Sequence, residues 1–568
     1  MPKDLKNLSI AILLSTLVLI GWQYFYESPR KAKIEAIQEL QKSSQIKKKE
    51  FLAKKVEHAN EQNEVHETQE IGEININTPK LAGSISLKGL RFNNLQLKDY
   101  KETLSNNSPL VKLFSSQDAQ SYFAEFGWIK DSKTSNFSVP DKNSIWKCDS
   151  KELTPNNQVN CKWESPENIS YIISISIDNK YLFTVSKTVE NKSSDSISFA
   201  SYGRLYKSHS EPKQFAILHE GCIGVFSDIL KESTYEDLSK ERQEIFTNTP
   251  GSWGGFTDKY WLSALIPDSN FASKTHFIAT KNQNEAIEHD SFNVNFITQD
   301  VNLLSNSSSK TTHHLFAGAK EEKTLNYYEK EEGFTLFDRA IDYGIFYFIT
   351  KPLLWLISYF YSLMGNFGLA IILVTFTLKL LLYPLANKSY TSMEKMKKLQ
   401  PKIEQIKKNC SENKVKFNQE IMELYKKEKV NPAAGCLPLL IQIPLFFSLY
   451  KVIFISLEMR HAPFYGWIKD LSAADPTSVW NLFGLLPWGH IGMLDIGIWP
   501  LIMGLTMFLQ QKMSPAPADP IQASVMKFMP LLLMVMLYSL PSGLMIYWSF
   551  SNILSVLQQY MISRGAKK

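Results

Sequence analysis

The chain has 568 residues and a formal net charge of +6. This length exceeds that of one simple domain, and the mild charge, without a basic stripe interleaved with aromatic residues, does not favour a nucleic-acid binder. The five cysteines contain no CxxC pair, which argues against zinc or thioredoxin-type chemistry, and we expect no metal and no cofactor. The residues divide into a polar, strand-like part, from about Glu27 to Phe334, and an apolar part, from about Gly344 to Ile562.

The first predicted element is an uncharged apolar run of 19 residues, Leu8 to Tyr26. It is long enough to span a hydrocarbon core of roughly 30 Å. It exceeds the usual apolar region of a signal peptide and ends in aromatic rather than small residues, so we predict an uncleaved transmembrane anchor over residues 1–27. Residues 28–70 are rich in Lys, Glu, Gln and Asn, and we predict a polar linker there.

Residues 71–334 are predicted to form a mostly antiparallel β domain, large enough for a sandwich of two sheets. The clearest signal is a hairpin. Ile173–Asp178 alternates apolar and polar residues, Asn179 and Lys180 offer a turn, and Tyr181–Ser186 alternates again. The same alternation marks two further stretches, Ser84–Phe92 and Phe292–Val301.

This β domain shows little sign of chemistry. Adjacent strand residues point to opposite faces, so we interpret His313 and His314 as a surface pair rather than as metal ligands. The aromatic stretch Gly251–Trp261 could line a sugar or peptide cleft, but core and turn residues are the favoured interpretation. One disulfide can form among three cysteines, and the sequence does not assign its partners: Cys148, Cys161 and Cys222.

The apolar part begins with 31 residues, Leu353 to Tyr383, interrupted by Gly365 and Asn366. As one helix they would extend roughly 46 Å, more than a bilayer core needs. We therefore predict an interfacial amphipathic helix within residues 335–366 and, within a core of residues 367–568, a first span from about Phe367 to Ala386. Four further spans are predicted, the second of them interrupted by Pro500: Gly435–Phe454, Asp495–Gln511, Phe528–Leu540 and Gly543–Met561.

The loop over residues 387–431 holds twelve lysines and no arginine. The positive-inside rule places this loop in the cytoplasm, which puts both termini inside and the β domain outside. Apolar residues recur at helical spacing in two stretches, Met393–Ile406 and Phe417–Leu424. The loop is therefore predicted to form a cytoplasmic hairpin of two helices.

Lys379 is a cation inside an apolar span, where it costs roughly 2.5–3.5 kcal/mol on insertion scales. Thr375 lies one turn before it and Tyr383 one turn after it, on the same helical face. We interpret this face as the wall of a polar cavity, and the alternative is that Lys379 snorkels to the inner interface. Further polar side chains lie in the second and the last core spans: Gln442, Tyr547 and Asn552.

Taken together, six segments resemble the YidC/Oxa/Alb family of membrane insertases, in its Gram-negative type with a large periplasmic domain. They are Ser84–Tyr100, Thr391–Lys407, Leu424–Tyr450, Ala462–Pro476, Thr506–Pro515 and Phe528–Trp548. The resemblance implies a multi-pass protein of a bacterial inner membrane with a periplasmic β-supersandwich. It also implies five core spans around a hydrophilic groove, through which nascent membrane proteins are inserted and folded without enzymatic catalysis.

The resemblance also implies roles and partners. The groove cation falls on Lys379, where the family usually has arginine, the polar groove residue falls on Thr375, and an aromatic pair falls on Tyr547 and Trp548, where some members have two tyrosines. The implied partners are nascent membrane proteins, the Sec translocon, membrane lipid and, transiently, the ribosome and the signal recognition machinery.

Two other classes of protein compete with this interpretation. An ion- or solute-coupled membrane transporter could also carry one buried lysine, but it would more often show paired intramembrane acids or inverted repeats. A membrane-anchored carbohydrate-binding sensor would account for the β domain and would leave the apolar part unexplained.

Overall fold

The computed structural model describes residues 72–116, 121–130, 137–208, 218–282, 289–410, 414–428, 430, 437–486, 495–515 and 520–565. The anchor predicted for residues 1–27 and the linker predicted for residues 28–70 lie outside the described residues. The chain divides into two compact units. The larger holds the β domain and most of the helices, and the smaller includes Lys397–Ile421 and Pro515–Leu532.

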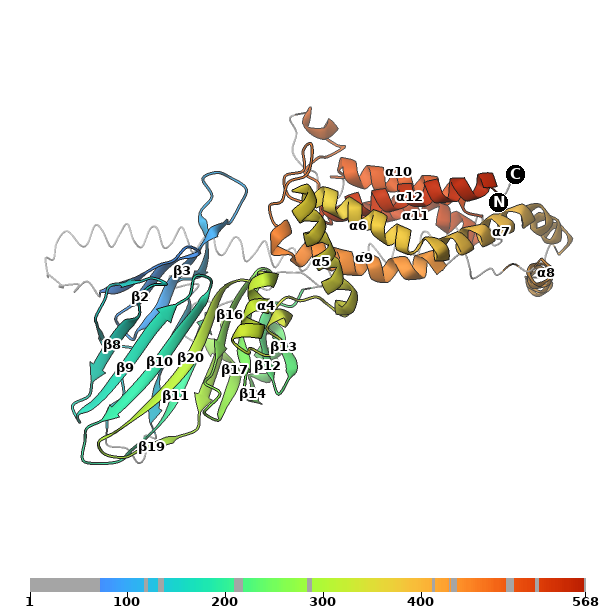
Figure 1. Ribbon diagram of the computed structural model, residues 1–568. Helices are drawn as coiled ribbons and strands as arrows, with labels where there is room; N and C mark the ends of the chain where they lie inside the picture. Colours follow the sequence, from blue (N-terminus) through green and yellow to red (C-terminus); the bar gives the residue numbers. More distant parts are fainter. Residues whose placement is uncertain are drawn as a thin grey trace. The chain divides into compact units, whose positions relative to one another are not determined.

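Within the described residues, the β domain consists of two large sheets (Figure 1). The eleven-stranded sheet runs in the order β14 (Gln243–Thr247), β17 (Ser273–Asn282), β18 (His289–Thr298), β11 (Ile197–Lys207), β5 (Tyr122–Lys130), β3 (Arg91–Lys101), β2 (Leu81–Ser86), β1 (Glu73–Asn77) and β7 (Glu152–Leu153), with β19 (Val301–Leu303) against β11 and β4 (Leu110–Phe114) against β3. The nine-stranded sheet runs in the order β13 (Ile229–Thr234), β12 (Gly221–Phe226), β15 (Trp253–Thr257), β16 (Trp261–Ile266), β20 (Ser307–Ala319), β10 (Leu182–Asn191), β9 (Ile169–Ile177), β8 (Val159–Glu164) and β6 (Lys147–Cys148). The predicted two-sheet β domain is confirmed.

The predicted hairpin is the pair β9–β10, which is antiparallel and places Phe183 opposite Ile177. The Asp178 side chain accepts hydrogen bonds from the backbone N–H groups of Lys180 and Leu182, at 2.8 and 3.0 Å. This short side chain therefore closes the turn that the sequence predicted.

Two other alternating stretches are not single strands. Ser84–Phe92 contains the end of β2, a turn, and the start of β3, because Gly89 and Leu90 take left-handed backbone angles with φ of 69° and 46°. The stretch that begins at Phe292 leaves β18 after Thr298, and a second short strand, β19, follows. In both stretches the apolar positions change phase at the turn, from Leu87 to Leu90 and from Phe296 to Ile297, and the prediction overlooked this change.

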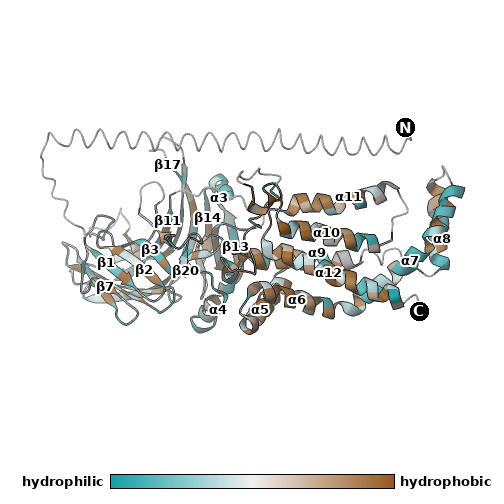
Figure 2. Cartoon of the chain, turned by 90° about the horizontal axis from the view of Figure 1, so that it is seen from above, coloured by the Kyte–Doolittle hydropathy of each residue, from teal (hydrophilic) through white to brown (hydrophobic). Residues whose placement is uncertain are grey.

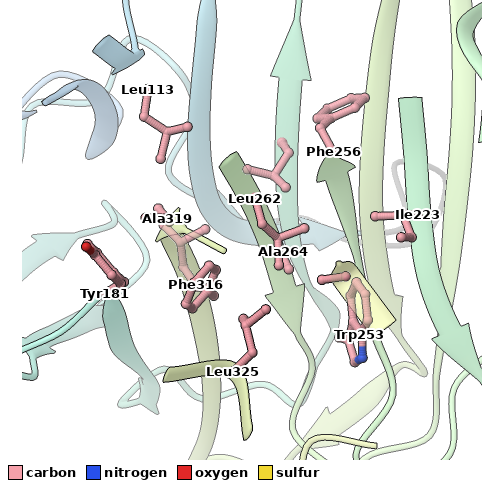
Figure 3. Close-up of a cluster of buried hydrophobic side chains, with 14 of the residues drawn as sticks. Leu113, Tyr181, Ile223, Trp253, Phe256, Leu262, Ala264, Phe316, Ala319 and Leu325 are labelled. Carbon is pink, nitrogen blue, oxygen red and sulfur yellow. The ribbon is translucent and has the colours of Figure 1, made fainter. Parts of the chain in front are cut away.

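Large aromatic side chains pack on both faces of the nine-stranded sheet: Phe256 contacts Tyr122 of the other sheet, whereas Trp253 contacts Phe337 on the opposite face. Tyr181, Trp253, Phe256 and Phe316 are each at most 1% exposed, and Figure 3 shows them beside aliphatic residues of neighbouring strands. The Trp253 indole N–H also donates to the Thr335 carbonyl at 2.9 Å, so burial leaves no unpaired donor. Burying a large apolar side chain contributes about 1.5–3 kcal/mol. The interpretation of Gly251–Trp261 as core and turn residues is therefore confirmed.

The space between the two sheets encloses two polar side chains that face inward from the nine-stranded sheet. Lys187 stands at an inward position of β10, and its Nζ donates to the carbonyls of Gly127 and Tyr202 at 3.0 and 2.8 Å. The prediction of a surface histidine pair is wrong, because His313 is fully buried, with its ring within 3.1 Å of the Ser201 hydroxyl. Burial holds the pKa of Lys187 and that of His313 well below their ordinary values.

One disulfide joins Cys148 of β6 to Cys161 of β8, and Cys222 lies buried as a free thiol. The two bonded residues face each other across an antiparallel pair of strands. The structure thus assigns the pairing that the sequence left open.

The apolar part is helical. The described helices are α3 (Tyr235–Glu241) and α4 (Glu322–Glu331) at the β domain, then α5 (Tyr347–Met364), α6 (Phe367–Leu381), α7 (Tyr383–Asn409), α8 (Lys414–Lys427), α9 (Leu437–Ile455), α10 (Ile498–Met513), α11 (Pro520–Leu537) and α12 (Ser542–Gly565), with short 3-10 turns at Phe337–Ala340, Leu457–Met459 and Leu482–Gly484. Figure 2 shows α9, α10 and α11 as mainly hydrophobic and α8 as mainly hydrophilic. Helices α5 and α6 are separated at Gly365 and Asn366, where the sequence predicted a break.

The first predicted core span, Phe367–Ala386, is not one continuous helix. Helix α6 ends at Leu381, α7 begins at Tyr383, and the two axes differ by 68°. Proline cannot donate a backbone hydrogen bond, and its ring collides with the carbonyl four residues earlier, so the first turn of a new helix is the favourable place for Pro384. The span therefore bends four residues before its predicted end.

Among the described residues, one segment has the length and the apolar composition needed to cross a membrane. The bent pair α6–α7 is long and apolar enough when its two helices are taken together, whereas no single described helix meets the criterion alone. Shorter apolar stretches occupy Ile441–Ile455 and Ala523–Leu537. The predicted number of spans stays a prediction.

Two helix boundaries differ from the predicted ones. Helix α10 is not interrupted by Pro500, because this proline is the third residue of the helix. Backbone N–H groups in the first turn have no acceptor within the helix, so a residue without an N–H breaks no hydrogen bond there. Helix α11 begins at Pro520, eight residues before the predicted start at Phe528. In the lysine-rich region, α7 ends at Asn409 and α8 begins at Lys414, as expected for a helical hairpin, and Leu399, Ile403 and Ile421 are buried.

Candidate functional site

A small pocket lies among α6, the start of α7, α9 and α12, within the larger unit. Its volume is about 50 Å³, which is room for a few water molecules. Polar and apolar side chains line it together: Thr375, Leu378, Lys379, Leu382, Leu385, Ala386, Ser389, Tyr390, Ile441, Gln442, Leu445 and Tyr547. Four of the seven residues predicted to line the groove thus share one pocket.

Lys379 is the only cation that lines this pocket among the described residues. Its ammonium donates to the Ser555 hydroxyl of α12 at 2.8 Å, and Ser555 in turn donates to the Ser551 carbonyl at 2.9 Å. No carboxylate belongs to the described lining of the pocket. The lysine is therefore held by a neutral partner, and its charge is left for a ligand or for water.

A second hydrogen bond between polar side chains at the pocket joins α9 to α12. The Gln442 amide donates to the Tyr547 hydroxyl at 2.6 Å, and Tyr547 is 2% exposed. Thr375 is buried at the pocket, and its hydroxyl donates to the Ile371 carbonyl of its own helix at 2.7 Å. This bond satisfies the hydroxyl donor and leaves an oxygen lone pair for a further donor.

Three predicted groove residues are not among those that line the pocket. Tyr383 is 43% exposed, and its backbone carbonyl accepts a hydrogen bond from Gln558 at 3.5 Å. Trp548 packs on Phe446, with ring centroids 4.6 Å apart. Asn552 is buried, and its amide donates to the Thr506 hydroxyl of α10 at 3.2 Å.

Sequence reasoning missed Ser555, the residue that holds the cation, and Ser389, which lines the pocket from α7. A signal for Ser555 was available, because Tyr547, Ser551 and Ser555 follow at intervals of four and so share one face of α12. No comparable signal marked Ser389, which reaches the pocket through the bend at Leu382.

Two family models match the chain. One, described as the YidC periplasmic domain, matches residues 73–356, and the other, described as 60Kd inner membrane protein, matches residues 359–568. Together they cover the β domain and the helical part.

Curated relatives match along the whole chain. The membrane protein insertase YidC of Rickettsia bellii is 47% identical over 568 residues, which are 99% of this chain and all of that protein. The Rickettsia felis insertase is 48% identical with the same coverage. Among solved structures, an active YidC insertase with its first transmembrane domain resolved is 18% identical, covers 86% of this chain and 92% of its own, and has a TM-score of 0.37.

A β domain of two large sheets, followed by apolar helices with a polar pocket among them, defines the class as a membrane protein with a large β domain. The family matches agree with that class and narrow it: one is to an inner membrane protein and the other to a periplasmic domain. The chain belongs to the YidC family of membrane protein insertases. It is an insertase of the inner membrane, not an enzyme, and its β domain is periplasmic.

Proposed function

We propose that the pocket around Lys379 receives hydrophilic segments of incoming membrane proteins while their apolar segments pass along the core helices. The observation that carries this proposal is the hydrogen bond from the Lys379 ammonium to neutral Ser555, in a pocket with no described carboxylate. A polar segment in lipid loses the water around its backbone and charges, at a cost of several kcal/mol for each group. Pocket water and fixed polar side chains replace part of that hydration.

Photo-crosslinking tests this role. A photoreactive amino acid at Gln442, which lines the pocket, is expected to crosslink to the hydrophilic tail of an arrested nascent membrane protein. The matched control is Leu505 of α10, which is 60% exposed and does not line the pocket. Crosslinks to the tail from Leu505 but not from Gln442 would contradict the proposal.

The implied partners are examined with the same crosslinked material. We propose the Sec translocon as a partner, and the ribosome and the signal recognition machinery as transient partners, on the resemblance described above. Antibodies against translocon and ribosomal subunits should detect them after crosslinking in intact cells. Their absence from material that does contain nascent chain would remove them as partners.

We also propose that both termini and the α7–α8 hairpin are cytoplasmic. The twelve lysines of residues 387–431 support this orientation. The disulfide between Cys148 and Cys161 supports the opposite side for the β domain, because disulfides persist in oxidising compartments.

Cysteine labelling on intact cells measures this topology. In a chain with Cys222, Cys410 and Cys436 replaced by serine, we expect an impermeant thiol reagent to label Lys192→Cys in the β domain and not Lys407→Cys in α7. Both positions are exposed in the structure. The reverse labelling pattern would invert the proposed orientation.

A further inference from the structure

A second and larger pocket, of about 600 Å³, lies where the β domain meets the helical part, within the larger unit. We call it the junction pocket. Its walls come from β13 and the residues just before β12, from the segment Arg339–Phe346, and from α9. Its volume falls in the range of about 300–1,000 Å³ that small-molecule sites occupy.

Charged residues of both signs line the junction pocket. Lys451 of α9 forms a salt bridge of 2.6 Å with Asp342, and both side chains are largely buried. Arg339 stacks on the Tyr347 ring, 4.0 Å from its centroid, and has no salt bridge in the described part of the chain. Glu232 of β13 is exposed toward solvent. The two cations, Arg339 and Lys451, balance the two carboxylates, Asp342 and Glu232, which suits a ligand that carries both a negative and a positive group.

The pocket also contains an unsatisfied donor. The Ser448 hydroxyl lines the pocket from α9, its side chain is 1% exposed, and no hydrogen-bond partner for it exists among the described residues. A buried polar group without a partner is destabilising, so such groups are rare in native proteins. A ligand oxygen in the pocket would satisfy this hydroxyl.

The position of the pocket indicates the source of the ligand. The segment Arg339–Phe346 joins the periplasmic domain to the inner-membrane part, so the pocket lies at the periplasmic surface of the membrane. Apolar side chains flank it: Ile345 is 89% exposed and Phe447 is 46% exposed. A free phosphate compound in water would leave these apolar surfaces uncovered, whereas a lipid would cover them with its acyl chains.

We propose that the junction pocket binds the headgroup of a zwitterionic, amine-bearing glycerophospholipid. Arg339 and the Ser448 hydroxyl bind the phosphate, and Glu232 faces the amine. The acyl chains lie against Ile345 and Phe447. This site is separate from the pocket around Lys379, and its occupancy does not depend on how that pocket handles substrates.

Native mass spectrometry of the full-length protein, released from nanodiscs of mixed phosphatidylethanolamine and phosphatidylglycerol, tests the site. The wild-type protein should retain one phosphatidylethanolamine molecule per chain. Arg339→Gln should lower this occupancy at least five-fold, and Ser448→Val about two-fold. Glu232→Gln should abolish the preference for phosphatidylethanolamine over phosphatidylglycerol, because the repulsion of the anionic headgroup is lost.

Arg564→Gln is the matched control, because Arg564 also stacks on a tyrosine, Tyr560, at 4.9 Å, but does not line the junction pocket. It should retain lipid as the wild type does. Equal retention by the wild type and Arg339→Gln would overturn the proposal, and so would displacement of the lipid by inorganic phosphate, which would indicate a site for the free anion. If Arg339→Gln fails to fold, as judged by thermal unfolding, Ser448→Val and Glu232→Gln decide the question. Lipid retention and preference unchanged in both would reject the site.

Discussion

Lys379→Glu is expected to lower the insertion of substrates with acidic translocated tails on the order of ten-fold, while Lys379→Arg keeps the wild-type rate. A unit charge about 8 Å from a tail carboxylate contributes about 0.5–2 kcal/mol at effective dielectric constants between 80 and 20, so charge reversal changes the interaction by about 1–4 kcal/mol, and the ten-fold effect lies near the lower end of this range. Arginine stays protonated and keeps the attraction. Lys379→Ala should fall between the two, with its loss largest for acidic tails.

The measurement is insertion into proteoliposomes of three matched substrates, whose tails are acidic, neutral and basic. Lys512→Glu serves as the control, because Lys512 is an exposed cation in the last turn of α10 and does not line the pocket. It should insert all three substrates as the wild type does. If the Ala and Glu variants at position 379 insert all three tails at the wild-type rate, the electrostatic role is excluded and Lys379 is a snorkelling residue.

Lys187→Met is expected to remove a pH dependence from the stability of the β domain. Burial holds the pKa of Lys187 well below its ordinary value of 10.5, so the unfolded chain binds a proton that the folded chain releases. Protons therefore favour the unfolded state. Between the folded-state pKa and 10.5, the free energy of unfolding rises as the pH rises. The slope there reaches about 1.4 kcal/mol per pH unit.

Hydrogen exchange of the β10 and β20 amides in the full-length protein in detergent, corrected for the intrinsic exchange rate, measures this slope between pH 6 and 9. The wild type should gain protection as pH rises, and Lys187→Met should gain less. Lys310→Met is the matched control, since Lys310 is an exposed lysine of β20, paired with the residue next to Lys187. It should keep the wild-type slope. Equal slopes in all three proteins would show that Lys187 stays protonated in the core.

The sequence predicted the parts of the fold that depend on local pattern. Period-two alternation placed the β9–β10 hairpin, and the glycine at position 365 placed the boundary between α5 and α6, where it takes a left-handed φ of 65° at the end of the helix. At Gly89 and Leu90 the apolar residues move from odd to even positions, and this change of phase marks a turn that the prediction overlooked. Apolar content also could not show that Pro384 bends the first core span.

The polar residues were harder to place, because their partners are distant in sequence. Lys379 was singled out by its apolar neighbours, yet the residue that binds it, Ser555, lies 176 positions further along the chain. Asn552 was placed in the groove because it is a polar residue in an apolar helix. Its side chain instead donates a hydrogen bond to Thr506 of α10 and does not line the pocket. Lys187 is in phase with the apolar residues Val185 and Val189 of its strand, which favours an inward position, but only the packing of the two sheets shows that this lysine is buried. Which side chains share a cavity is decided by packing, not by local periodicity.

The disulfide at β6 helps to protect an edge of the β domain against aggregation. Aggregation is a particular risk for a protein that handles unfolded chains. Exposed edge strands carry unpaired backbone groups and can recruit another strand, which starts aggregation. At the β6 end of the nine-stranded sheet, within the described residues, the outermost strand is only two residues long, and one of them is bonded covalently to β8. An edge strand this short offers few unpaired backbone groups with which a strand of an unfolded substrate could pair. This edge of the β domain should therefore resist strand addition by the proteins that the insertase handles.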